Sequence, residues 1–167
     1  SDDSQVDRVA FMTPSVVLGR FRLAVGHPAF SDIGPIRHHV VAFPRTAVWI
    51  EQEGRRRFVA DSSLATVYNP RQAYLRHPIS PRGDESDWIG VSEDLAREIV
   101  ARHDTADAMA VRPFRHAAAP VSRALYLEQW QLFEPAITGD HASLEIEERA
   151  IAIVANTISA AYGGVRA

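Results

Sequence analysis

The chain has 167 residues, of which 46% are hydrophobic and 23% charged, the composition of an ordinary folded domain. It contains no cysteine, which excludes disulfides, thiol nucleophiles and every thiolate metal site. A formal net charge of −3 argues against DNA binding by this chain alone, because duplex affinity comes largely from a basic face. All 18 basic residues are arginine, which excludes Schiff-base lysines and phosphate-loop lysines.

Short apolar segments predict β-structure over the first part of the chain. Residues 17–25 alternate apolar and polar side chains, which is typical of a strand with one buried face. Further strands are expected at 39–43, 47–50, 58–59, 64–68, 73–77 and 86–91, with turns between them at 53–54, 69–70 and 80–84. Strands of this length and spacing indicate a sandwich or barrel rather than alternating β and α units.

The pattern changes at Ser92, which is a suitable N-cap for a first helix. A second helix is expected over 120–133, with Pro120 in its first turn, and a third from its cap at Ser143 to the glycines at 163–164. The alanine-rich stretch between the first two helices is interpreted as a connector. The expected domains are a β domain over 8–103, a connector over 104–119 and a helical segment over 120–163.

Four aromatic residues in the predicted strands are candidates for a binding pocket: Trp49, Tyr68, Tyr74 and Trp88. Each combines a wide apolar face with one polar atom. The interior of a small β-barrel must be filled either by side chains or by a ligand. These residues therefore either line a pocket or form ordinary core. Arg45 is a further candidate, because an inward guanidinium could bind a carboxylate-bearing effector in bidentate fashion.

The histidines raise the question of a metal site. His38 and His39 are adjacent, and neighbouring strand residues point to opposite faces, so only one of them can face inward. His39, Glu51 and His77 would together make a three-ligand set that zinc or iron accepts. The alternative is that the histidines form structural hydrogen bonds or contact an effector, and His77 is counted as a candidate ligand-binding residue on that ground.

The sequence carries no signature of a hydrolase or nucleotide-binding enzyme. It contains no GxSxG nucleophile motif, no HExxH motif and no glycine-rich phosphate loop. Asp84 and Asp87, which flank Glu85, are interpreted as part of a solvated turn rather than as catalytic carboxylates. The chain is therefore not expected to be an enzyme.

The last predicted helix has an apolar stripe that contains Leu144, Ile151, Val154 and Ile158. This stripe is wider than one short partner helix needs. Burial in a two-fold interface between two copies would cover it, with the helix antiparallel to its copy. The alternative is packing against the strands or against the preceding helix of the same chain.

Several motifs occur in a fixed order: FPR at 43–45, VAD at 59–61, YNP at 68–70, and HP, GD and DW between His77 and Trp88. Together with LEIEERAIAIVANTI at 144–158, they make the chain resemble the N-terminal sensing domain of AraC-type bacterial transcription regulators. The resemblance extends from about Arg8 to Tyr162.

The resemblance implies a mainly β fold with C-terminal α-structure: a cupin-like β-barrel or jelly roll that holds a small effector, then an antiparallel helical pair that joins two protomers. Complete family members also carry helix-turn-helix units that bind DNA. This sequence does not contain them and begins at Ser1, so we expect a regulatory fragment of a longer protein.

No apolar run is long enough to span a bilayer, and the polar start is unlike a signal peptide, so a cytoplasmic protein is expected. The expected partners are a small-molecule effector, a second copy of the chain, and DNA only through the helix-turn-helix units. No cofactor is expected. The alternative function is a stand-alone metal-dependent cupin enzyme of the dioxygenase or isomerase class.

Overall fold

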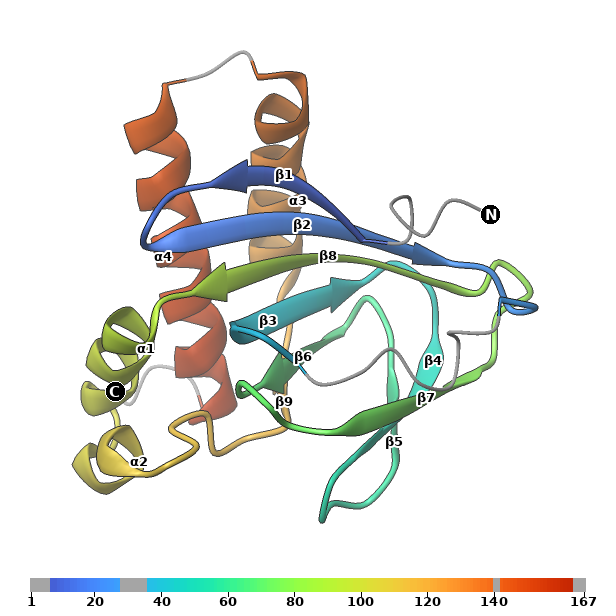
Figure 1. The fold of residues 1–167 in the computed structure, drawn as a ribbon, viewed down its shortest axis with the longest axis horizontal. Helices are drawn as coiled ribbons and strands as arrows, with labels where there is room; N and C mark the ends of the chain where they lie inside the picture. Colours follow the sequence, from blue (N-terminus) through green and yellow to red (C-terminus); the bar gives the residue numbers. More distant parts are fainter. Residues whose placement is uncertain (1–6, 28–35, 140–141, 164–167) are drawn as a thin grey trace.

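The computed structural model describes residues 7–27, 36–139 and 142–163. Its strands form two antiparallel sheets, one in the order β1-β2-β8-β3-β6-β9 and one in the order β5-β4-β7 (Figure 1). The strands are β1 (Asp7–Met12), β2 (Val16–Leu23), β3 (His39–Pro44), β4 (Val48–Gln52), β5 (Phe58–Ala60), β6 (Leu64–Tyr68), β7 (Tyr74–Pro78), β8 (Asp84–Val91) and β9 (Ala118–Pro120). The predicted fold class, mainly β with C-terminal α, is confirmed.

The helices are α1 (Glu93–Ala101), α2 (Thr105–Met109), α3 (Arg123–Thr138) and α4 (Ser143–Ala161). The last two lie side by side and contact strands of the six-stranded sheet (Figure 1). That sheet is therefore covered on both faces, by helices on one and by the smaller sheet on the other. This explains why every residue of β3 is buried and why the sequence after His39, from Val40 to Pro44, is one apolar run rather than an alternation.

Strand alternation divides the buried residues into two sets. Val41 and Ile89 point toward the helices and belong to the main hydrophobic core. Their chain neighbours Val40, Ala42 and Trp88 point the other way, toward the smaller sheet, where they form a separate cluster with Tyr68. Each central strand therefore contributes to the helix-packed core with one face and to the space between the sheets with the other.

Several predicted boundaries need correction. The segment 104–119 is not an irregular connector: it contains α2 and most of β9, which pairs with β6 at the edge of the large sheet. The second predicted helix begins later than Pro120, because Ser122 accepts a hydrogen bond from the Leu125 amide and acts as its N-cap. It also continues through Pro135 to a left-handed cap at Gly139.

Two further differences lie at the ends of the described chain. Strand β1 was not predicted, because its position at a sheet edge leaves most of its residues exposed and its sequence without a clear alternation. Ser143 is the first residue of α4 rather than its cap, and the N-cap Ala142 makes no side-chain bond. The predicted end of this helix is confirmed, since Gly163 follows it with φ +95.

The structure shows which residues of the predicted dimerisation stripe are already buried within one chain. Val154 and Ile158 are buried in the core between α4 and the large sheet, so the prediction that they face a second copy is wrong for both. Ile151 is half-buried and Leu144 is 67% exposed. Only these two members of the predicted set remain accessible to a partner, because packing against the strands of the same chain uses the others.

Candidate functional site

A cavity of about 490 Å³ lies between the two sheets. This volume is in the range of pockets that hold metabolite-sized ligands. Both sheets and the segment before β3 contribute to its walls. The lining residues are Asp7, Val9, Phe21, Ile36, Arg37, His38, Val40, Ala42, Pro44, Val48, Ile50, Ala60, Thr66, Tyr68, Tyr74, Arg76, Asp84, Ser86 and Trp88.

Three of the six predicted ligand-binding residues line this cavity, namely Tyr68, Tyr74 and Trp88. The rings of Tyr68 and Tyr74 lie 4.8 Å apart, centroid to centroid, and form an aromatic wall. Burial raises the pKa of Tyr74 to about 12 and raises the pKa of Tyr68 even further above its ordinary value. Both phenols therefore stay protonated at neutral pH and can donate a hydrogen bond.

The other three, Arg45, Trp49 and His77, are not in the cavity. Successive residues along a strand point to opposite faces of the sheet, and these three lie on the faces that point away from the cavity. In the small sheet Ile50 pairs with Arg76 and faces inward, so their neighbours Trp49 and His77 pair on the outer face. The Trp49 ring there contacts the guanidinium of Arg57, 4.2 Å from its centroid. Arg45 leaves the large sheet on the helix side.

The same parity separates the predicted metal ligands. His77 and Glu51 lie 3.4 Å apart on the outer face of the small sheet, largely in solvent. His39 is buried on the helix side of the large sheet, where its ring meets the Phe114 ring edge to face. The predicted three-ligand set is therefore wrong. Among the described residues no group of three or more histidine, aspartate or glutamate side chains is placed to hold a metal ion.

The deep polar group of the cavity is an ion pair that the sequence interpretation missed. Arg76 on β7 donates to Asp84 on β8 and to the hydroxyl of Tyr74. The Arg76 guanidinium also lies over the ring of Phe21, 4.1 Å from its centroid. Arg76 is 4% exposed and Asp84 is 5% exposed. Burial is the larger influence on the pKa of Asp84 and raises it, while Arg76 opposes the rise.

The placement of Asp84 corrects one prediction. Asp84 and Asp87 do not belong to a solvated turn; both are buried in β8, on opposite faces of the sheet. The spacing of two residues along a strand is the sequence signal that could have placed Arg76 and Asp84 in the cavity. Arg76 is two positions after Tyr74, and Asp84 is four before Trp88, so each shares the face of an aromatic residue already considered.

Trp88 closes one side of the cavity and is held by three neighbours. Its indole nitrogen donates to Asp7 over 2.8 Å, and the ring of His38 stacks against it at a centroid distance of 6.4 Å. Gly19 pairs with Trp88 across the sheet, and a Cβ at Gly19 would overlap the indole ring. Glycine is required here for the close approach of the ring, and neither Asp7 nor Gly19 could be assigned this role without the tertiary structure.

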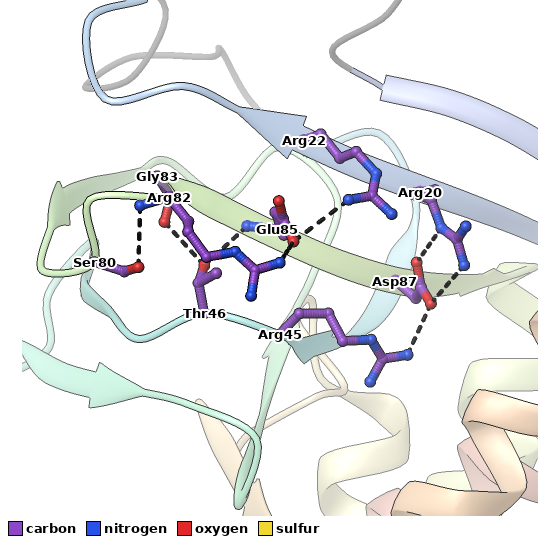
Figure 2. A network of polar contacts seen from close by, with 9 residues as sticks. All are labelled: Arg20, Arg22, Arg45, Thr46, Ser80, Arg82, Gly83, Glu85 and Asp87. Carbon is purple, nitrogen blue, oxygen red and sulfur yellow. Dashed lines mark hydrogen bonds and ion pairs between the residues drawn. The ribbon is translucent and has the colours of Figure 1, made fainter.

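The opposite face of β8 carries a second polar network, which Figure 2 shows from close by. Asp87 accepts from Arg20 over 2.8 Å and from Arg45 over 2.7 Å. Arg45 also donates to Gln129 of α3 over 2.7 Å. Its guanidinium lies 4.8 Å from the ring centroid of Trp130 on the same helix. Asp87 stands between Ser86 and Trp88, so one strand joins the cavity wall to the contact with α3.

Searches of family models and of curated proteins give no match to this chain. Solved structures do match. A variant of ToxT from Vibrio cholerae without ligand gives a TM-score of 0.61 at 5% identity, covering 92% of this chain and 59% of that one. The AraC-like transcriptional activator CuxR gives 0.55 at 12% identity, covering 88% and 53%. ToxT bound to an unsaturated fatty acid gives 0.52 at 7% identity, covering 92% and 57%.

At these identities the comparison establishes the fold. Nearly the whole of this chain has the architecture found in a part of ToxT and of CuxR, and it spans little more than half the length of either protein. In the described part of the chain, none of the helices combines the length and apolar character needed to cross a membrane.

Proposed function

We propose that the chain is the effector-sensing and dimerisation domain of an AraC-type transcription regulator, and that the cavity between the two sheets is the effector site. The observation that carries the proposal is the position of β8. Its residues Ser86 and Trp88 line the cavity, and Asp87 between them pairs with Arg45, which donates to Gln129 of α3. The likeness in fold to an AraC-like activator supports it, as does the small-molecule ligand of ToxT.

In this proposal the chain binds its effector and is not an enzyme. A ligand between the sheets contacts Trp88 and shifts the population of β8 positions. Because Asp87 moves with the same strand, Arg45 and α3 respond on the other face. The helices then change how two protomers present the DNA-binding segments of the parent protein. The parent protein acts on DNA in the cytoplasm, in keeping with the sequence resemblance.

The proposed homodimer uses the helical pair. Leu144 on α4 and Trp130 on α3 are exposed, at 67% and 47% respectively, and Ile151 is half-buried. A two-fold contact between the helical pairs would cover these side chains. The proposed interface therefore keeps Leu144 and Ile151 of the predicted stripe and adds Trp130 of α3, while Val154 and Ile158 stay in the core.

A cavity-filling variant tests the effector site. Ala42 lines the cavity, and the substitution Ala42→Phe places a large ring in it. Ala124→Phe, at an exposed position of α3, is the matched control. We expect members of a metabolite library to raise the melting temperature of the wild type and of the control but not of Ala42→Phe. Equal responses from all three proteins, or none from the wild type, would reject the proposed site.

A further inference from the structure

The charge inside the cavity indicates which ligands it accepts. Arg76 is the only buried arginine among the described residues of its lining, and Asp84 already neutralises it. The other lining arginine, Arg37, is exposed at the rim. A ligand that reaches the deep end therefore meets a closed ion pair rather than a free cation.

We propose that the cavity takes an uncharged, largely apolar ligand that carries a hydroxyl or carbonyl group. This inference rests on the proposed function and adds the chemical class of the effector. Most of the wall is apolar, including Phe21, Val40 and Ile50. Hydroxyl groups that can bond a neutral ligand are those of Tyr68 and Tyr74, which remain protonated, and those of Thr66 and Ser86, all of them in the lining.

An anionic ligand is disfavoured by the same geometry. A carboxylate at the deep end would lose its water and would have to compete with Asp84 for Arg76. Displacing one partner of a buried ion pair leaves an uncompensated charge, which weakens binding on the order of a hundredfold. Pairing at the rim with Arg37 offers little in return, because ion pairs in solvent contribute little.

The inference differs from what the fold comparison alone would suggest. A fatty acid binds ToxT, but the two chains share only 7% identity over the matched region. Likeness of the backbone at that level does not fix the charge of the lining. Arg76 and Asp84 are features of this sequence, and they decide the preference here.

Matched pairs of neutral and acidic compounds test the inference: decanol with decanoate, naphthol with naphthoate, and phenethyl alcohol with phenylacetate. Dissociation constants are measured by calorimetry on the full chain, with Ala42→Phe as the occluded control. We expect the neutral member to bind at least tenfold more tightly in every pair that binds, and Ala42→Phe to bind neither. Tighter and Ala42→Phe-sensitive binding of the acids would overturn the inference and leave the proposed function standing. If no member binds the wild type, both fail.

Releasing Arg76 should reverse the preference. In Asp84→Asn the guanidinium loses its counter-charge, so the acids should gain at least tenfold in affinity while the neutral compounds change little. Glu85→Gln is the matched control, because it makes the same change on the face of β8 that points away from the cavity, where Glu85 pairs with Arg82 (Figure 2). Unchanged selectivity in a folded Asp84→Asn overturns the inference. If circular dichroism shows that this variant is unfolded, the apolar pair Arg76→Met with Asp84→Leu replaces it: retained preference for neutral compounds supports the inference, and a switch to acids overturns it.

Discussion

Replacing Arg45 by alanine should detach α3 from the large sheet at one point, with a measurable cost. The side chain is 10% exposed and donates to Asp87 and to Gln129, both over 2.7 Å. Each charge-assisted bond contributes roughly 1.5–3 kcal/mol. Two terms reduce the loss: Arg20 still holds Asp87 in the variant, and Nη1 of Arg45 is buried without a hydrogen-bond partner in the described structure, which already costs the native state. We expect Arg45→Ala to lower the free energy of unfolding by about 2–3 kcal/mol.

Urea denaturation followed by circular dichroism gives this free energy directly. Arg22→Ala is the control from the same face of the sheet: Arg22 is 53% exposed and lies 3.4 Å from Glu85, so its loss should cost at most about 0.5 kcal/mol. The Arg45 guanidinium contacts the Trp130 indole, so Arg45→Ala should also change the fluorescence emission of Trp130 relative to the wild type. Equal stabilities of the two variants would show that the bonds of Arg45 do not hold α3 against β8.

Three further outcomes follow from the structure. Gly19→Ala should destabilise the fold by roughly 1–3 kcal/mol through overlap with the Trp88 indole, and the cost should vanish when Trp88 is also replaced by alanine; an additive double-mutant cycle would contradict this. Burial lowers the pKa of His39 from its ordinary value of 6.5, so the unfolded state binds the proton first and stability should fall as pH drops below 6.5. Denaturation at several pH values measures how the free energy of unfolding depends on pH. Below pH 6.5 this dependence should be weaker in His39→Gln than in the wild type, by at most about 1.4 kcal/mol per pH unit, and an unchanged dependence would contradict this role of His39. Leu144→Asp should weaken the proposed dimer in light scattering without changing the monomer's melting temperature, and a wild type that is monomeric at every concentration would remove the dimer from the account.

Most strands were predictable from sequence because a strand buried on one face alternates apolar and polar residues, and a strand buried on both faces is a short apolar run. Residues 64–68 and 73–77 were placed within a residue of β6 and β7, since turn residues bound them on both sides. Strand β1 escaped because an exposed edge strand needs no apolar alternation. The short strand β9 was not predicted because Ala118 and Ala119 lie in an alanine-rich stretch and do not form a recognisable apolar strand segment.

The site was harder to predict because it depends on which face each strand turns inward. At the end of β3, Ala42 and Pro44 face the cavity, while Phe43 and the next residue after the strand, Arg45, face the helices, and both sets are buried or nearly so. Hydrophobicity alone cannot separate two buried faces. Arg45 was therefore considered for the pocket although it lies on the other face, and Arg76 was missed although it shares the face of Tyr74, which was predicted to line the pocket.

The acidic residues were misjudged for a related reason. Asp84 and Asp87 follow a glycine-containing turn and look solvated in sequence, yet each is buried beside an arginine. Asp84 meets Arg76 of the preceding strand, and Asp87 meets Arg45, which lies directly after β3. Arg76 and Arg45 supply the counter-charges that make burial possible. Period-two spacing could have placed Arg76 and Asp84 on the inner faces of their strands, but which arginine meets which aspartate depends on the tertiary structure.

Effector sensing by this chain requires that a small molecule occupy the space between the two sheets. A crystal structure with the tightest-binding neutral compound tests it most directly. We expect ligand density against the rings of Tyr68 and Tyr74, with the bond from Arg76 to Asp84 intact and β8 displaced relative to the free protein. Density confined to the outer surface, or a space between the sheets filled by the protein's own side chains, would contradict it.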